Sequence, residues 1–196
     1  VENAGVHSGD ATMCIPSTSI PDNVKHKMRN YTKKIARRLN IQGPFNIQYL
    51  IKDGEVYVIE CNLRASRSMP FVSKTTGVNL MELAADATLG KSIPSGEAAA
   101  SRFCVKVPQF SFMRLDGADP VTGVEMVSTG EVACFGNSFE DAFLKAFVAS
   151  GQNIPEKGDS ILITVGGSKE RIVPIAKKFL MQHSHIYATE HTAETL

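Results

Sequence analysis

The strongest structural signal in the chain is a pair of strand-like runs, residues 45–51 and 55–62, on either side of an Asp-Gly dipeptide. Asp-Gly between β-rich runs is typical of a tight hairpin, because both residues tolerate positive φ angles. We predict a three-residue loop, Lys52-Asp53-Gly54, in which Gly54 takes the left-handed position of a bulge. With this loop, four polar side chains share one face of the hairpin: Asn46, Gln48, Glu60 and Asn62.

The second strand of the hairpin ends in oxygen-rich side chains. Glu60 and Asn62 are two positions apart, so they project to the same face, and we expect Val56 and Val58 to precede them on it. A carboxylate and an amide at the rim of an otherwise apolar strand need a partner, and a hard cation such as Mg²⁺ binds such oxygens. The alternative is a solvent-exposed strand end that binds no metal.

Two arginines, Arg64 and Arg67, follow the strand with no acidic residue between them. Guanidinium groups form paired, charge-assisted hydrogen bonds with phosphate and carboxylate oxygens. A carboxylate followed by two arginines therefore suits an anionic, phosphate-bearing substrate. Solvated surface arginines would give the same sequence, and these residues alone leave both interpretations open.

The remaining pattern predicts helices separated by short strands. Apolar residues at helical spacing predict helices over 22–39, 75–90 and 138–150, the last opened by a capping box of Ser138 and Asp141. Beyond a polar stretch the pattern changes to a strand at 160–165, a helix at 168–182 and a strand at 186–189. Strand–helix–strand is the opening of a parallel α/β domain.

The composition is that of an ordinary globular protein. Hydrophobic residues make up 43% and charged residues 21%, which excludes a disordered chain. The formal charge of +1 argues against a broad nucleic-acid surface, and no apolar run approaches the roughly 18 residues that span a bilayer. The chain starts at Val1 rather than at Met and ends at Leu196 within an unfinished pattern, so we expect a piece of a longer protein.

Four stretches of the chain carry a family resemblance: Glu2–Asp10, Gly43–Gln48, Ile59–Lys74 and Val124–Val132. The sequences of these stretches resemble the large chain of carbamoyl-phosphate synthase. The resemblance extends over nearly the whole of residues 1–196. That family carries two ATP-grasp units in tandem, and the stretch from Pro70 to Lys74 resembles the second unit. The second unit uses ATP to phosphorylate carbamate to carbamoyl phosphate, which feeds pyrimidine and arginine or urea synthesis.

The resemblance implies a fold and a division of the chain. Residues 1–151 would form an α+β ATP-grasp second lobe, a mainly antiparallel sheet with helices. A linker over 152–159 would lead to residues 160–196, the truncated start of a parallel α/β domain that resembles the family's methylglyoxal-synthase-like effector domain. The preceding lobe would lie before Val1.

The resemblance also implies roles for individual residues. The metal ligands, for Mg²⁺ or Mn²⁺ with K⁺ as a further candidate ion, would be Gln48, Glu60 and Asn62. The residues that contact ATP, directly or through the metal, would be Gly5, Val6, His7, Ser8, Gln48 and Glu60. The arginines that line the phosphate and carbamate site would be Arg64 and Arg67, and the residues that hold an anionic effector would be Lys169, Thr189 and Thr192.

Partners and compartment follow from the same resemblance. The expected partners are the rest of the large chain with its first ATP-grasp lobe and unit, a glutaminase subunit or domain, carbamate, and a small-molecule allosteric effector. No nucleic acid and no membrane is expected. The compartment would be the cytoplasm, or the mitochondrion for a urea-cycle type. The piece alone should be inactive, because phosphoryl transfer depends on positioning by both lobes.

Two other interpretations compete with this one. Another ATP-grasp carboxylase or ligase, such as biotin carboxylase, would share the fold. The sequence from Asn62 to Arg67 and the α/β domain that begins at residue 160 argue against this alternative. A non-catalytic regulatory or assembly module with this fold would be expected to lose the ligand set, which this chain retains.

Overall fold

The computed structural model describes residues 5–113, 115–166, 169–182 and 185–196. The chain divides into two compact units, Val1–Gly151 and Gln152–Leu196, and each is described by itself. Among the described residues, none of the helices combines the length and the apolar character that crossing a membrane requires.

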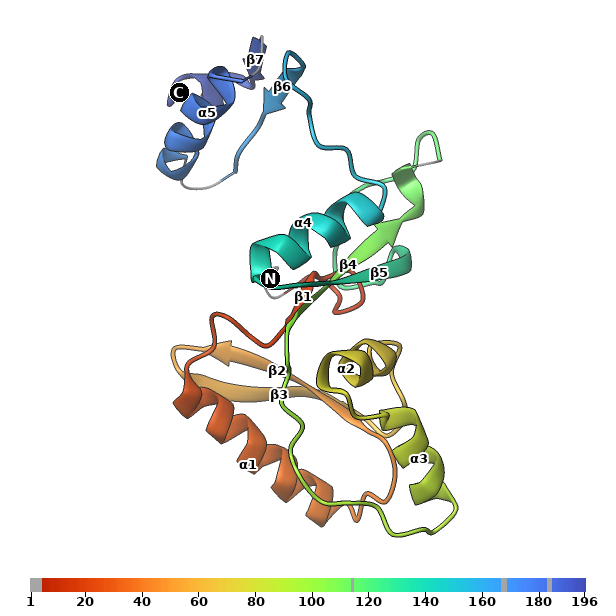
Figure 1. The fold of residues 1–196 in the computed structure, drawn as a ribbon. Helices are drawn as coiled ribbons and strands as arrows, with labels where there is room; N and C mark the ends of the chain where they lie inside the picture. Colours follow the sequence, from red (N-terminus) through yellow and green to blue (C-terminus); the bar gives the residue numbers. More distant parts are fainter. Residues whose placement is uncertain (1–4, 114, 167–168, 183–184) are drawn as a thin grey trace. The chain divides into compact units, whose positions relative to one another are not determined.

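The first unit contains a three-stranded antiparallel sheet in the order β1-β4-β5, with strands Met13–Ile15, Phe103–Phe110 and Ser128–Gly136. Helix α4, Phe139–Ala149, packs on one face of this sheet (Figure 1). The core between them consists of four buried residues: Val105, Val107, Ala142 and Ala146. A short 3₁₀ turn, Ser111–Met113, follows β4.

A second part of the first unit consists of a hairpin and a helix. Strands β2, Asn46–Lys52, and β3, Glu55–Asn62, form the antiparallel hairpin that the sequence predicts. Helix α1, Asp22–Arg38, lies along it (Figure 1) and confirms the amphipathic helix expected over 22–39. The two are joined by the Tyr49 hydroxyl, which lies 2.7 Å from Thr32 Oγ1 and donates to the carbonyl of Met28 at 3.4 Å.

The predicted three-residue loop of the hairpin is wrong. Lys52 pairs directly with Glu55, which leaves a two-residue turn of Asp53 and Gly54. Their φ angles are 52° and 76°, so both central residues are left-handed. Such a turn twists with the strands that it joins, which is why Asp-Gly favours it over the longer loop.

The helix expected over 75–90 is shorter in the structure, where α3 covers Leu80–Thr88. Residues 75 and 76 instead end a separate helix, α2 at Met69–Thr76, which the sequence analysis did not predict. Gly77 ends α2 with a φ of 75°, a left-handed conformation that no β-branched residue would adopt readily. Asn79 then begins α3, with its side chain accepting a hydrogen bond from the backbone N–H of Glu82. The predicted helix therefore began too early, because its first residues belong to the end of α2.

Of the two hydrogen bonds in the capping box predicted at the start of α4, the one from the Asp141 N–H to the Ser138 hydroxyl is confirmed. Ser138 has an extended backbone, and its hydroxyl accepts a hydrogen bond from the backbone N–H of Asp141 at 3.2 Å. The carboxylate of Asp141 in turn accepts from the backbone N–H of Asn137 at 3.1 Å. The first bond satisfies an N–H that the first turn of the helix leaves unpaired, and the second binds the residue before the N-cap to the same turn, so together they determine where α4 begins.

The second unit is a small β–α–β arrangement. Strands β6, Ser160–Ile163, and β7, His185–Ala188, pair in parallel, and helix α5, Val173–Leu180, lies between them in the chain. A 3₁₀ turn, Glu170–Ile172, precedes α5, and the short helix α6, Glu190–Ala193, follows β7. The start of the helix predicted over 168–182 includes a residue outside the described part of the chain.

We predict that Gly136→Ala destabilises the first unit. A Cβ atom at this position would collide with the backbone nitrogen of Ala142 and would lie 2.9 Å from its Cα, where α4 passes directly over β5. Backbone cannot yield as a side chain can, so we expect a loss of about 1 to 3 kcal/mol in the free energy of unfolding.

Urea unfolding of two variants measures this effect. Gly43→Ala is the matched control, because a Cβ atom there meets no heavy atom within 4 Å and its backbone has no positive φ. Equal midpoints for Gly136→Ala and Gly43→Ala would contradict the close packing of α4 on β5.

Candidate functional site

The polar end of the hairpin contains a β-bulge. Gln48 pairs with Glu60 and Asn46 pairs with Asn62, whereas Tyr49 pairs with Val58. Ile59 is therefore an extra residue without a partner on β2. The bulge brings Gln48 and Glu60 directly opposite each other, so they share a face of the hairpin, as the sequence analysis expects. The sequence analysis expected the extra residue in the turn, whereas the structure has it at Ile59.

The bulge also determines which face this is. Tyr49 and its partner Val58 share the face that meets α1, because the Tyr49 hydroxyl contacts Thr32 of that helix. Side chains alternate along a strand, so Gln48 and its partner Glu60 lie on the opposite face. The expectation that Val56 and Val58 precede Glu60 on its own face is therefore wrong, because the extra residue reverses the alternation.

Hydrogen bonds among these side chains orient the amide of Asn62. Its Nδ2 atom donates to Glu60 Oε1 at 2.9 Å and to Asn46 Oδ1 at 3.4 Å, so its oxygen points away from both acceptors. Glu60 is exposed, and Gln48 and Asn62 are half-buried. The hairpin end thus offers one carboxylate and two amide groups to a cation.

This donor set fits a magnesium ion that is also held by phosphate. Mg²⁺ is usually bound by one or two carboxylates together with substrate phosphates and water, rather than by a full protein cage. Among the described residues there is no group of three or more His, Cys, Asp or Glu side chains that could hold a metal by themselves. The single carboxylate of Glu60 is consistent with the first arrangement.

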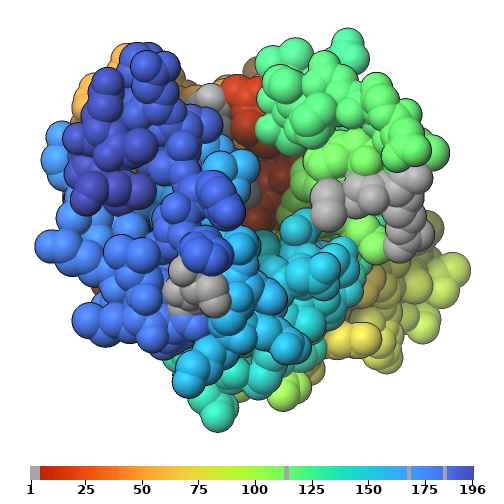
Figure 2. All heavy atoms as spheres, turned by 90° about the horizontal axis from the view of Figure 1, so that it is seen from above, coloured from red at the N-terminus to blue at the C-terminus, as the bar shows by residue number. Residues whose placement is uncertain are grey.

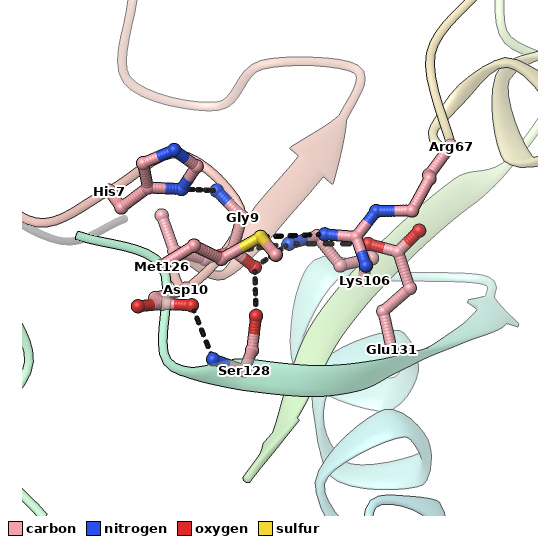
Figure 3. Close-up of polar contacts among 9 residues, drawn as sticks. His7, Gly9, Asp10, Arg67, Lys106, Met126, Ser128 and Glu131 are labelled. Atoms are coloured by element: carbon pink, nitrogen blue, oxygen red, sulfur yellow. Dashed lines mark hydrogen bonds and ion pairs between the residues drawn. The ribbon is translucent and has the colours of Figure 1, made fainter.

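The two arginines lie in the connection between β3 and α2. Arg64 is exposed and donates to the neighbouring carbonyl of Ala65 at 3.2 Å. Arg67 is also exposed, and its Nη2 atom donates to the sulfur of Met126 at 3.1 Å. Figure 3 shows Arg67 pointing toward Met126 and toward the first segment of the chain, the residues around Gly9 that precede β1. The hydrogen bond to Met126 therefore places Arg67 near Gly9, because the Met126 side chain lies beside that residue. Arg64 has no such hydrogen bond among the described residues.

The first segment forms a tight turn before β1. The backbone N–H of His7 donates to the carbonyl of Gly123 at 2.8 Å, and Figure 2 shows the red first segment beside the green segment that contains Gly123. The backbone N–H of Gly9 donates to His7 Nδ1 at 3.0 Å. Because Nδ1 accepts, a neutral imidazole carries its proton on Nε2 and offers that N–H to a ligand. Gly5 has a φ of 110°, and Val6 and Ser8 are half-buried in the same turn.

Asp10, which the sequence analysis did not single out, ties this turn to β5. Its carboxylate is buried, with 2% of the residue exposed, and accepts hydrogen bonds from the backbone N–H groups of Val127 at 3.0 Å and Ser128 at 2.9 Å. Burial by itself would raise the pKa of Asp10. Hydrogen bonds from the side chain of Ser128 and from these N–H groups outweigh burial, and His7 adds to their effect, so the pKa lies below its ordinary value of 3.8.

Lys106 is a second residue that sequence reasoning missed. It lies in the middle of β4 and is 4% exposed, yet its ammonium donates to the carbonyls of Gly9 and Ala11 at 3.2 and 2.7 Å. A lysine within the apolar run Phe103–Phe110 was a visible signal, because a charge in a buried strand requires nearby oxygens.

The residues matched to an effector site come together in the second unit. The hydroxyl of Thr189 donates to that of Thr192 at 3.1 Å and lies 3.2 Å from that of Thr164. Thr192 is 1% exposed and accepts from the backbone N–H of Val165 at 3.3 Å. The ammonium of Lys169 donates to the carbonyl of His191 in α6, beside this hydroxyl cluster.

Comparison with solved structures identifies the fold class. The biotin carboxylase of Campylobacter jejuni, solved as a βγ-ATP complex, superimposes with a TM-score of 0.57 at 14% identity, over 70% of this chain and 37% of that one. N5-carboxyaminoimidazole ribonucleotide synthetase of Thermus thermophilus superimposes with a TM-score of 0.54 at 14% identity, over 74% of this chain and 43% of that one. Both are ATP-grasp-type proteins, so this chain has an ATP-grasp-type fold, an antiparallel sheet with helices.

Comparison with sequences identifies the family. Residues 2–95 match the family described as carbamoyl-phosphate synthase L chain, ATP binding domain. The chain is 48% identical over 199 residues to the multifunctional protein ura1 of Schizosaccharomyces pombe and 45% identical over 205 residues to the mitochondrial carbamoyl-phosphate synthase (ammonia) of Mus musculus. These matches take in 99% and 100% of the chain. The resemblance to the carbamoyl-phosphate synthase large chain is therefore confirmed along the whole sequence.

The chain spans only a small share of these relatives, 9% of the Schizosaccharomyces pombe protein and 14% of the Mus musculus protein. The likeness therefore concerns one region of much longer polypeptides. What those proteins do as a whole is not a property of this region by itself.

We predict that Asp10→Asn lowers the stability of the first unit at neutral pH. An amide offers one acceptor oxygen where the carboxylate of Asp10 offers two to the N–H groups of Val127 and Ser128. We expect the free energy of unfolding to fall by about 1 to 3 kcal/mol.

The pH dependence of this difference follows from the lowered pKa. The stabilisation is complete above the ordinary value of 3.8 and is lost as the pH falls through the lower pKa of the folded state, where Asp10 becomes protonated. Urea midpoints measured from neutral pH down into the acidic range should therefore converge for the two proteins at the acidic end. A difference that grows toward low pH would contradict this assignment.

Proposed function

We propose that this chain is part of the carbamate-phosphorylating ATP-grasp unit of a carbamoyl-phosphate synthase. The observation that carries the proposal is the cluster at the end of the hairpin, where Gln48 and Glu60 lie opposite each other and Asn62 donates to Glu60 at 2.9 Å. By the resemblance, these positions would match the family's metal ligands, and the bulge at Ile59 presents them together on one face.

In the proposed reaction, the γ-phosphoryl group of ATP is transferred to an oxygen of carbamate. A bound Mg²⁺ or Mn²⁺ ion would neutralise charge on the transferring phosphoryl group. Gln48, Glu60 and Asn62 would hold that ion, and K⁺ is a further candidate. Arg64 and Arg67 are exposed beside the hairpin and would bind the phosphate and carbamate oxygens.

The turn at residues 5–8 is proposed to contact the nucleotide. Gly5 has a positive φ, and no heavy atom lies within 4 Å of the point that a Cβ atom would occupy, so the backbone is open to a close approach by a ligand. His7 would offer its Nε2 proton, since Nδ1 accepts from Gly9. Val6 and Ser8 complete this segment.

The second unit is proposed to be the start of the family's methylglyoxal-synthase-like effector domain, after a linker over 152–159. The parallel pairing of β6 and β7 supports this proposal. Lys169, Thr189 and Thr192 would bind an anionic effector, since an ammonium and hydroxyl groups are gathered there. The remaining expected partners are the rest of the large chain and a glutaminase subunit or domain, in the cytoplasm or, for a urea-cycle type, the mitochondrion.

The test is Glu60→Gln in the complete polypeptide that carries this sequence. This variant keeps the shape of the side chain and removes its charge, so metal binding at the hairpin should weaken. We expect the rate of carbamoyl phosphate formation from ATP, bicarbonate and ammonia to fall at least about a hundredfold.

Glu55→Gln is the matched control, because Glu55 is an exposed carboxylate on the same strand whose partner is Lys27 at 3.0 Å. It should leave the rate unchanged. Undiminished activity of Glu60→Gln would refute the catalytic proposal and favour the non-catalytic module. Formation of a different phosphorylated or carboxylated product would favour another ATP-grasp ligase.

A further inference from the structure

We propose that Lys106 is a positioning residue for nucleotide binding, acting through the carbonyl groups of Gly9 and Ala11. Its ammonium would hold the turn at residues 5–9 in the place where the nucleotide contacts it. The inference deepens the proposed function and rests on it, because that function supplies the nucleotide-binding role of the turn.

The position of Lys106 on the sheet is the first step of the argument. Val105 and Val107 belong to the core beneath α4, and side chains alternate along β4, so Lys106 lies on the other face of the sheet. That face is covered at this point by residues 9–11, and the carbonyls of Gly9 and Ala11 accept hydrogen bonds from the ammonium of Lys106. Lys106 is thereby buried to 4% exposure although it carries a charge.

The ammonium of Lys106 lies close to three oxygen atoms of the turn and of β5. Two are the backbone carbonyls of Gly9 and Ala11, at 3.2 and 2.7 Å, and the third is Oε2 of Glu131 on β5, at 3.8 Å. Figure 3 shows Lys106 between Gly9 and Glu131. The ammonium donates hydrogen bonds to both carbonyls and forms an ion pair with Glu131 of the sheet, so it holds both carbonyls in place relative to the sheet.

Gly9 is confined on its other side by Met126. A Cβ atom on Gly9 would lie 2.7 Å from the sulfur of Met126, and that sulfur accepts a hydrogen bond from Arg67 at 3.1 Å. Gly9 is therefore held between the ammonium of Lys106 and the thioether of Met126. A shift of the turn would also disturb the contact that places Arg67.

Stability alone does not explain a buried lysine at this position. Replacing both members of a buried ion pair by uncharged residues of similar size is often neutral for folding or even stabilising. Lys106 and Glu131, which is itself 12% exposed at its side chain, form such a pair. What the pair supplies, and an apolar pair would not, is a fixed position for the carbonyls of Gly9 and Ala11.

The test uses the double variant Lys106→Met/Glu131→Gln in the complete polypeptide, which leaves no unpaired buried charge. The assay is the reverse reaction of the proposed site. ADP attacks carbamoyl phosphate, the phosphoryl group moves to the terminal phosphate of ADP, and carbamate leaves. We expect the KM for ADP to rise about tenfold, as loss of hydrogen bonds to a charged group would cause, with kcat changed by less than about threefold.

A second readout locates the effect. Hydrogen exchange should become faster in the peptide that contains residues 5–12, while β4, β5 and α4 keep their protection. The matched control is Lys27→Met/Glu55→Gln. Lys27 also donates to one carboxylate, at 3.0 Å, and to one carbonyl, that of Gly54 at 3.2 Å, but it is exposed and lies beside the hairpin turn. Its KM for ADP should equal that of the unchanged protein.

An unchanged KM for ADP in the Lys106 variant would overturn the inference. So would a loss of exchange protection throughout β4, β5 and α4, because that would indicate a structural role. If the double variant does not fold, Glu131→Gln alone keeps the ammonium and should raise the KM about threefold, and an unchanged KM there overturns the inference equally.

The two proposals fail separately. If Glu60→Gln abolishes the reverse reaction while the Lys106 variant leaves the KM for ADP unchanged, only the positioning role is wrong. If Glu60→Gln has no effect on the reverse reaction, the proposed function itself falls.

Discussion

The register of the β2–β3 hairpin is the constraint on which the candidate site depends. A two-residue turn of Asp53 and Gly54 sets the pairing near the turn, and one extra residue, Ile59, changes it toward the far end. Because side chains on a strand alternate, a shift by one residue moves every later side chain to the other face. Without the bulge Glu60 would lie on the α1 face with Val58, rather than opposite Gln48.

A bulge costs ladder hydrogen bonds, so it persists where the surrounding structure favours it. Here the strand before the bulge uses one face to pack on α1, through Tyr49 and its contact with Thr32. The strand after it carries Glu60 and Asn62, whose side chains are joined by a hydrogen bond of 2.9 Å. The two halves of one hairpin thus serve different neighbours, a helix on one face and an open polar site on the other.

The turn before β1 is held from two sides by buried charges of opposite sign. The carboxylate of Asp10 accepts from the N–H groups of Val127 and Ser128, and the ammonium of Lys106 donates to the carbonyls of Gly9 and Ala11. Backbone groups in an irregular turn lack partners in a ladder, so side-chain charges can satisfy them. This explains how an irregular segment is held firmly against a regular sheet.

Features that depend on a few neighbouring residues were predicted well from the sequence. The hairpin, helix α1 and the bond from Asp141 to Ser138 all follow from local patterns of turn residues, apolar spacing and capping. The family resemblance likewise rests on runs of adjacent residues. Helix α2 was not predicted, and the predicted helix was begun before the end of α2 at Gly77. The turn length was misjudged because a bulge at the turn and a bulge farther along both place Gln48 and Glu60 on one face of the hairpin.

The sequence by itself therefore determined that a hairpin with a polar end precedes two arginines, and which residues are candidates to bind a metal. Only the tertiary structure decided which face of the hairpin Glu60 occupies, since that depends on one unpaired residue in the ladder. It alone revealed Asp10 and Lys106, whose partners lie far away in the chain, at separations of 118 and 97 residues. Contacts over such distances leave no local pattern, because their energy comes from burial and hydrogen bonding that exist only after the sheet has formed.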